Sequence, residues 1–310
     1  MPDVKIPDNV SHPLADVIRE RLGCAQSASL AVAFLRRSGL RMVGKPLARF
    51  LERGTHAECI FGFDYMFTEP EALTDLMDLS RSHPGLRFFG FLGQAGEEGI
   101  YHPKLYIFRE DVLTHVIVGS SNLTRGGLRQ NLEANVLLSG APRDPPIVEA
   151  EHLYRDVRND DSLFTPDAEY VVRYGELYKA SRSARGTGAS RAAIVRLRRE
   201  LERRQEALPG TVPTQRQLIA EAIRTLRRDA QEFVHLRDIA AWVEDEARRR
   251  RLQFKWDTLR NSVRGRLNEH TVGKSGDDLF ERQGGVGGRY GRYRLTEKGD
   301  LLRMRPTPVE

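Results

Sequence analysis

The chain has 310 residues, of which 40% are apolar, and its formal net charge is +6, from 49 Lys and Arg against 43 Asp and Glu. This length suggests two domains, each with a hydrophobic core of its own. The first residues, MPDVKIPDNVSHP, lack the apolar segment of a signal peptide, and no run approaches the length of a membrane span. Two cysteines, Cys24 and Cys59, make neither a disulfide framework nor a zinc site. We therefore expect a cytoplasmic protein with no membrane partner.

Charge is divided unevenly along the chain. From Ser181 onward there are 29 Lys and Arg against 18 Asp and Glu, a net of +11, whereas residues 1–180 hold 20 against 25, a net of −5. Such an asymmetry indicates a polyanionic partner for the C-terminal part, with DNA as the first candidate. A solvated arginine-rich surface would give the same composition, so charge alone does not show whether the C-terminal part binds a polyanion.

In the N-terminal half, short apolar segments alternate with segments whose apolar residues have helical periodicity. The pattern predicts helices over 12–22, 46–52, 68–82, 147–157 and 169–180, and strands over 27–34, 58–63, 86–92, 105–108, 116–118 and 132–138. Thr68, Pro70 and Glu71 are the residue types of a capped helix start. Strands that alternate with helices predict an α/β sandwich over residues 1–180.

The C-terminal half has a different organisation. Residues 181–190 are small, polar and basic, and 191–207 have helical composition, so 181–210 are expected to form a linker and a connecting helix. Amphipathic helices are predicted over 214–229, 233–247 and 258–270, followed by two short apolar segments around a glycine-rich turn. This order predicts a mainly α winged helix-turn-helix domain over 211–310. The segment resembles the HARE-type winged-helix modules that are attached to restriction enzymes and chromatin proteins.

Basic and polar residues of this second domain are candidates for DNA contacts. Those in the glycine-rich turn suit contacts with the phosphate backbone, and those on and before the third helix suit groove contacts, although some must simply belong to a solvated helix face. The candidates are Lys255, Arg260, Asn261, Arg264, Arg289 and Arg292.

Residues 101–133 carry the candidate chemistry. Alternate side chains of a strand share a face, so His102 and Lys104 are expected to point the same way, as are Ser120 and Asn122. An imidazole can attack phosphorus or transfer protons, and the other donors can stabilise the charge that develops on the phosphoryl oxygens. The alternative is that these are unrelated surface residues. Against it, an ammonium among apolar strand residues is unfavourable without a partner.

The combination His102-Pro-Lys104, Gly119-Ser-Ser-Asn122 and Asn131-Leu-Glu133 resembles the H-x-K…G-S-x-N core of the phospholipase D superfamily. The later glutamate is similar to that of its metal-independent restriction endonucleases. The resemblance covers roughly residues 1–180 and implies a phospholipase D-like α/β sandwich. One position departs from the lipid-hydrolase pattern, because Arg109 stands where that pattern has aspartate.

This resemblance implies a metal-independent DNA endonuclease that needs no cofactor. Because such a site uses two histidines and the chain supplies one H-x-K, it implies a homodimer with a shared site. His102 would form a covalent phosphohistidine, Lys104, Ser120 and Asn122 would stabilise charge, and Glu133 would orient the imidazole. Arg125 flanks the motif and is a candidate phosphate contact or part of a solvated turn.

The setting implied is restriction or another form of phage defence, and a methyltransferase or helicase partner is left open. Two alternative functions stay open as well. One is a DNA-binding regulator whose phospholipase D-like domain only dimerises. The other is a phospholipid or small-diester hydrolase, which would leave the basic C-terminal part without a role.

Overall fold

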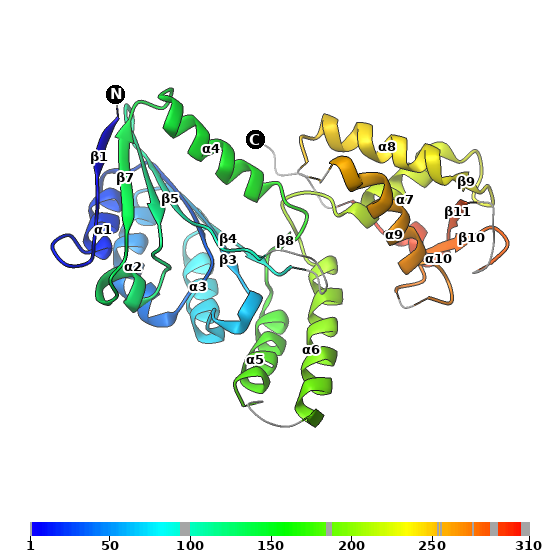
Figure 1. The fold of residues 1–310 in the computed structure, drawn as a ribbon, viewed down its shortest axis with the longest axis horizontal. Coiled ribbons are helices and arrows are strands. Elements are labelled where there is room, and N and C mark those ends of the chain that lie inside the picture. Colours follow the sequence, from blue (N-terminus) through cyan, green and yellow to red (C-terminus); the bar gives the residue numbers. More distant parts are fainter. Residues whose placement is uncertain are drawn as a thin grey trace. The chain divides into compact units, whose positions relative to one another are not determined.

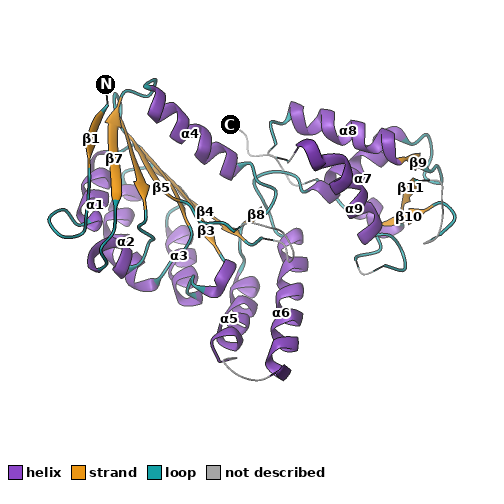
Figure 2. Cartoon of the chain, viewed as in Figure 1, coloured by secondary structure: helices purple, strands orange, loops and turns teal. Residues whose placement is uncertain are grey.

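The chain folds into two compact units in the computed structural model, which describes residues 2–93, 100–183, 188–252, 254, 256–274, 276–285 and 291–304 (Figures 1 and 2). The first unit comprises Met1–Arg158 and Ser162–Leu208, and the second comprises Asn159–Asp161 and Pro209–Glu310.

An eight-stranded mixed sheet forms the centre of the first unit, in the order β1-β7-β6-β5-β2-β3-β4-β8. Strands β2, β3 and β4 are parallel, and all other neighbouring pairs are antiparallel. The inner strands are buried on both faces, which explains their near-continuous apolar sequences. The strands are β1 (Asp3–Lys5), β2 (Ser27–Val32), β3 (His56–Gly62), β4 (Leu86–Phe91), β5 (Lys104–Arg109), β6 (Thr114–Gly119), β7 (Asn135–Gly140) and β8 (Leu163–Phe164).

Helices cover both faces of this sheet, with α1, α2 and α3 on one face and α4 on the other (Figure 1). The larger core lies on the first face and includes Phe50, Phe61 and Tyr174, whereas Ile147 and Tyr154 of α4 belong to a smaller core on the second face. The α/β architecture expected from the sequence is therefore observed. The helices are α1 (Leu14–Cys24), α2 (Arg37–Glu52), α3 (Pro70–Ser82), α4 (Pro145–Arg158), α5 (Ala168–Ser183) and α6 (Gly188–Ala207), with short helical turns η1 (Asp64–Met66) and η2 (Gly126–Gln130).

Helix α2 begins nine residues before Pro46, where the sequence pattern placed its start. A proline inside a helix leaves the carbonyl four residues earlier without its hydrogen bond. Here that carbonyl belongs to Met42, and it accepts a hydrogen bond of 3.1 Å from Arg19 Nε of α1. A tertiary contact thus satisfies the group that the proline leaves free.

Thr68 does not cap α3, contrary to the prediction. The residue at the N-cap is Glu69, and Pro70 opens the helix. The Thr68 hydroxyl instead donates to the Gly62 carbonyl at 2.6 Å and accepts from the Leu35 N–H at 3.2 Å. Thr68 therefore ties together the chain segments that follow β2 and β3.

Residues 188–207, for which the sequence suggested a connecting helix, form α6 and pack against α5 within the first unit. Leu201 and Leu208 are buried in the larger core, and the amide of Gln205 donates to the carbonyls of Leu92 and Ser162. Arg204 binds the carboxylate of Asp167 at 2.6 Å. The first unit consequently extends to Leu208.

The second unit has the element order helix, strand, helix, helix and hairpin. Its three-stranded sheet has the order β10-β11-β9, and its core includes Ile219, Ile239, Val263 and Phe280. The short strand β9 replaces the start of the helix that was predicted from residue 233. The elements are α7 (Gln215–Leu226), β9 (Val234–His235), α8 (Leu236–Arg249), η3 (Trp256–Thr258), α9 (Leu259–Glu269), β10 (Phe280–Arg282), β11 (Arg292–Leu295) and α10 (Glu297–Leu301).

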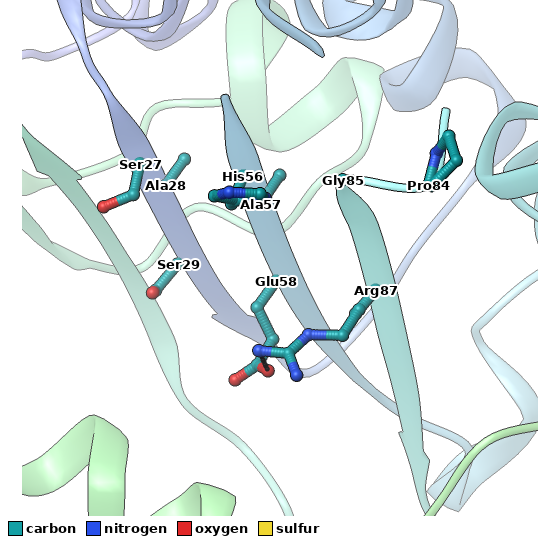
Figure 3. Close-up of a pocket in the computed structure, with 9 residues that line it drawn as sticks. All are labelled: Ser27, Ala28, Ser29, His56, Ala57, Glu58, Pro84, Gly85 and Arg87. Carbon is teal, nitrogen blue, oxygen red and sulfur yellow. Dashed lines mark ion pairs between the residues drawn. The ribbon is translucent and has the colours of Figure 1, made fainter. Parts of the chain in front are cut away.

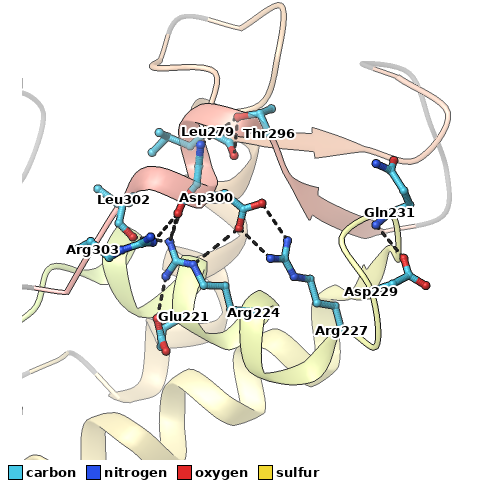
Figure 4. A network of polar contacts seen from close by, with 11 residues as sticks. Glu221, Arg224, Arg227, Asp229, Gln231, Leu279, Thr296, Asp300, Leu302 and Arg303 are labelled. Atoms are coloured by element: carbon cyan, nitrogen blue, oxygen red, sulfur yellow. Dashed lines mark hydrogen bonds and ion pairs between the residues drawn. The ribbon is translucent and has the colours of Figure 1, made fainter.

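Helix α7 is capped at one end and bound to α10 at the other. Thr214 and Gln217 form a reciprocal capping box at its start. Near its end, Arg227 makes two hydrogen bonds with the Asp300 carboxylate, at 2.8 and 3.2 Å. Arg224 donates to the carbonyls of Gly299, Asp300 and Leu302, so that its guanidinium closes the C-terminal end of α10 (Figure 4).

Within the described ranges, no helix is both long enough and apolar enough to cross a membrane.

We expect Asp300→Ala to lower the free energy of unfolding of the second unit by about 1–2 kcal/mol, because two guanidinium groups lose a charged partner. The two tryptophans of the chain, Trp242 and Trp256, both lie in this unit. Urea unfolding followed by tryptophan fluorescence therefore monitors it selectively. Asp245→Ala is the matched control, since Asp245 is exposed on α8, and it should stay within about 0.5 kcal/mol of the wild type. Equal stability of the two variants would contradict the assigned role of Asp300.

Candidate active site

The candidate catalytic residues gather at one end of the sheet, where β2 and β6 end and β5 begins. The register pairs Val32 of β2 with Lys104 of β5 and Leu105 with Val118 of β6. The Ala33 N–H continues the pairing by donating to the Pro103 carbonyl at 2.9 Å. His102 therefore lies just outside the sheet, and the Ser120–Asn122 segment follows the end of the neighbouring strand.

His102 and Lys104 are in direct contact. The Lys104 ammonium lies 2.5 Å from Nδ1 and 3.0 Å from Nε2 of the imidazole, and it donates to the His102 carbonyl at 2.9 Å. The histidine ring is exposed, whereas Lys104 is only 9% exposed. The imidazole of His102 thus lies at the surface, in contact with the buried ammonium of Lys104 at the start of β5.

The electrostatics of this pair favour a neutral imidazole. Partial burial, and then the positive charge of Lys104, lower the pKa of His102 below its ordinary value. Burial also lowers the pKa of Lys104, and the nearby Glu133 carboxylate acts in the opposite direction. A neutral imidazole has a free lone pair at neutral pH and is the form that can act as a nucleophile.

Asn122 and Ser120 lie beside this pair but are held by different partners. The Asn122 carboxamide oxygen accepts from the Phe34 N–H at 3.0 Å, which fixes the side chain to the segment that leaves β2. The Ser120 hydroxyl donates to Glu133 and accepts from the Ala134 N–H at 3.1 Å. With its oxygen engaged, the Asn122 amide keeps its NH₂ group as a donor.

Glu133 contacts Ser120 and not His102 in the described part of the chain. One carboxylate oxygen accepts from Ser120 and the other accepts from the Asn131 amide at 3.1 Å. The reason is the sheet register, because Gly119 pairs with Asn135, and Ser120 therefore lies opposite Ala134, the residue that follows Glu133. The expected contact with the imidazole within one chain is replaced by a link to the serine.

Gly119, Tyr106 and Asn135 shape the loop that carries Ser120 and Asn122, and sequence reasoning missed the last two. A side chain at Gly119 would place its Cβ 2.3 Å from the Ala134 carbonyl oxygen, so only glycine fits. The buried Asn135 amide donates to the Ser121 hydroxyl at 2.9 Å. Tyr106 of β5 donates to the Ser121 carbonyl, also at 2.9 Å. The G-S-x-N pattern pointed to this loop, but it gave no signal for Tyr106 or Asn135.

Two further residues support His102 from the ends of β2 and β3. The Phe34 ring packs edge-on against the imidazole, with centroids 5.5 Å apart. The buried Asp64 carboxylate accepts from the Gly93 N–H at 3.2 Å and from the backbone N–H of Tyr101, the residue before His102. Burial raises the pKa of Asp64. Residues 94–99 of the glycine-rich segment, between Gly93 and Tyr101, lie outside the described residues.

Arg109 lies at the opposite end of β5 from Lys104. It forms a two-pronged ion pair with Glu151, at 2.6 and 2.7 Å, and donates to Ser29 at 2.8 Å. Its role in this chain is thus to join β5, β2 and α4, and it has no place in the candidate site.

A hollow of about 470 Å³ also lies at that opposite end, among the first residues of β2, β3 and β4 (Figure 3). The Glu58 carboxylate at its wall is bound by Arg158 at 2.8 Å, Tyr154 at 3.0 Å and Arg87 at 3.1 Å. This hollow is separate from the candidate catalytic residues. In the described ranges, no group of three or more His, Cys, Asp or Glu side chains is arranged to hold a metal ion.

The candidate DNA contacts fall in both units. Arg125 is exposed in the first unit, three residues after Asn122. In the second unit, Arg260, Asn261 and Arg264 are exposed together on α9, and Arg292 is exposed at the start of β11. Lys255 and Arg289 lie outside the described residues.

Comparisons with solved structures give several distant likenesses. NucT from Helicobacter pylori is 13% identical, with a TM-score of 0.42, over 54% of this chain and 100% of that chain. Nuc from Salmonella typhimurium, a phospholipase D family member, is 16% identical, with a TM-score of 0.43, over the same shares. Phosphatidylserine synthase from Haemophilus influenzae Rd KW20 is 15% identical, with a TM-score of 0.43, over 63% of this chain and 48% of that chain.

No curated protein matches the chain. A family model described as "Cardiolipin synthase, PLD-like domain" matches residues 30–151. The match includes His102, Lys104, Ser120, Asn122 and Glu133, together with the strands that position them. The chain therefore contains a phospholipase D-like domain.

Proposed function

We propose that this protein is a metal-independent DNA endonuclease that acts through a covalent phosphohistidine at a site shared by two copies of the chain. The observation that carries the proposal is the contact between the Lys104 ammonium and the exposed His102 imidazole, beside Ser120 and Asn122. A nucleophile that adjoins a buried cation and neutral donors suits a phosphodiester, which carries one negative charge and gains more on its oxygens during reaction.

The chemistry needs two imidazoles in sequence. A neutral nitrogen of His102 attacks phosphorus and forms a P–N bond while the bond to the leaving oxygen breaks. His102 of the partner subunit, in its protonated form, donates its proton to that oxygen and becomes neutral. It then takes a proton from water, whose oxygen attacks phosphorus and releases the first His102. Lys104, Asn122 and Ser120 stabilise the charged phosphoryl oxygens, and the loss of one such donor typically costs about 10²–10³ in rate.

The shared site requires a surface on which two copies can meet. Val118 of β6 and Val136 of β7 are paired in register at the candidate-site end of the sheet, and they are 44% and 39% exposed. Leu132, in the loop between them, is 88% exposed. Apolar side chains exposed beside a catalytic loop are typical of an interface, and a second copy would cover them while it supplies the second imidazole.

The second unit is proposed to be a winged-helix DNA-binding domain. Helices α7, α8 and α9 and strands β9, β10 and β11 follow one another in the order of that fold, and α9 presents Arg260, Asn261 and Arg264 on one exposed face. Residues Pro209–Glu310 of this unit hold 21 Lys and Arg against 15 Asp and Glu, a net of +6. A basic helix face followed by a hairpin suits binding to a groove and to the adjacent phosphates.

A nuclease unit joined to a DNA-binding unit suits restriction or another form of phage defence, and we include this setting in the proposal. A methyltransferase or helicase partner would fit the same setting. DNA and a second copy of the chain are the partners that the argument requires.

We expect the purified protein to cleave plasmid DNA in the presence of excess EDTA. His102→Ala should lower the cleavage rate by at least about 10³, because it removes both the nucleophile and the acid. His152→Ala is the matched control, since His152 is exposed on α4. Gel analysis of plasmid, single-stranded DNA and phosphatidylcholine vesicles under the same conditions identifies the substrate class. Turnover of the vesicles without DNA cleavage, or full activity of His102→Ala, would contradict the proposal.

Co-expression of wild-type and His102→Ala chains tests the shared site. If each dimer holds one site that needs both imidazoles, an equal mixture retains about a quarter of the wild-type activity, because only dimers of two wild-type chains are active. Independent sites would retain about half. Val136→Asp should yield monomers in sedimentation and lose activity, whereas an active monomer would exclude a shared site.

Replacement of Lys104 by Met should raise the pKa of His102 toward its ordinary value of 6.5, because the variant removes the positive charge beside the ring while burial continues to lower the pKa. The measurement is an NMR titration of the imidazole nitrogens. Lys45→Met removes an exposed lysine of α2 and should leave the His102 titration unchanged. An unchanged or lower pKa in Lys104→Met would contradict the contact.

A further inference from the structure

Helix α2 carries a continuous stripe of positive charge on its outer face. Arg37, Arg41, Lys45 and Arg49 follow one another at intervals of four residues, and all four are exposed. Residues four apart on a helix lie on one side, about 6 Å from each other. The stripe is therefore about 18 Å long. The other exposed charge on this face is Glu52 at the last turn.

Ion pairing does not explain the stripe. Arg37 is paired with Asp75 at 2.6 Å. Across the described parts of the chain, no carboxylate lies within 4 Å of the Arg41, Lys45 or Arg49 side chain. Like charges four residues apart destabilise a helix, and cations in its first turn oppose the helix dipole. The stripe thus lowers the stability of α2, in the part of the chain whose net charge is −5.

The stripe begins at the catalytic loop. The Arg36 N–H, just before α2, donates to the Leu123 carbonyl at 3.0 Å. The two backbones approach so closely that a Cβ at Gly39 would lie 2.2 Å from the Leu123 oxygen. Arg125 is bound to Ser38 of α2 through its backbone N–H at 3.4 Å. The start of α2 is thus fixed beside Asn122, and the stripe leads away from it.

We propose that Arg41, Lys45 and Arg49, continued by Arg125 at the loop, bind the phosphate backbone of the DNA strand that extends from the scissile phosphate. The inference rests on the proposed nuclease function and names a binding track for that same site. The three cations of the stripe that lack a carboxylate partner can each contact one phosphate of the strand. Contacts of this kind fix the position of the duplex and carry no base specificity.

The test compares two charge-matched triple variants. The first combines Arg41→Ala, Lys45→Ala and Arg49→Ala. The control combines Arg143→Ala, Arg155→Ala and Lys179→Ala, which removes three exposed cations from the loop before α4, from α4 and from α5. Both triples remove the same charge from the first unit. A difference between them therefore reports the location of the charge and not its amount.

Binding of a 30-base-pair duplex is measured by fluorescence anisotropy over a range of salt concentrations, with His102→Ala in every protein so that no cleavage occurs. Each lost phosphate contact lowers the slope of log K against log salt by about 0.9, so the α2 triple should lower it by about 2–3. The control triple should change it by less than 1. Equal slopes for the two triples would overturn the proposed track, whether or not the protein proves to be a nuclease.

Turnover separates this inference from the proposed function. With His102 intact, the α2 triple should cleave the duplex with kcat/KM lowered at least about tenfold at 0.15 M salt, because the phosphate contacts are lost. Its turnover of bis(p-nitrophenyl) phosphate, which is too small to reach α2, should equal that of the wild type. Absence of turnover in the wild type would overturn the nuclease proposal alone. Equal kcat/KM of the two triples on the duplex would overturn the track alone.

Discussion

The candidate site depends on a buried ammonium group at the end of a sheet. An ammonium removed from water is unfavourable unless polar groups surround it, and Lys104 finds them in the carbonyl and ring nitrogens of His102 and in the charge of Glu133. These contacts hold the imidazole near one position, and partial burial together with the charge of Lys104 lowers its pKa. The close approach of Gly119 to the Ala134 carbonyl places the Ser120–Asn122 segment near His102 and Lys104. The candidate chemistry therefore depends on His102 and Lys104 at the start of β5, and not on a large cavity.

The residue types at the site could be predicted from the sequence, because strand alternation and the spacing of His102, Lys104, Ser120 and Asn122 are local properties. The partner of Glu133 could not, because it depends on the register between β6 and β7, which pairs Gly119 with Asn135. A shift of one residue would turn every side chain of β7 to the other face. The contributions of Phe34 and Asp64 were also hidden, since each comes from a strand end that only the folded sheet brings to His102.

In the fold too, some features follow from the local sequence and others depend on contacts between residues distant in sequence. The buried strands were predicted because their apolar runs are short and bounded by turn residues. Helix α2 was predicted to start too late, because Pro46 normally opens a helix, whereas Arg19 satisfies the carbonyl that this proline leaves free. Residues 191–207 were expected to form a helix that connects the domains, yet Leu201 of α6 is buried in the core of the first unit. In each case a contact distant in sequence overrides a local preference.

The net charge of a domain does not show where on its surface a polyanion can bind. Residues 1–180 have a net charge of −5, which by itself argues against DNA, and the +11 of residues 181–310 directs attention to the C-terminal part. Eight of the cations in that count, however, belong to residues 181–208 of the first unit. Yet a bound phosphate responds chiefly to charges within about one Debye length, roughly 8 Å at physiological salt. At that scale the outer face of α2 is strongly positive, while acidic residues such as Glu58, Asp64 and Glu151 are paired or buried elsewhere. The first unit, with 28 Lys and Arg against 26 Asp and Glu, can therefore bind a polyanion along one helix, provided that its carboxylates are neutralised by internal partners.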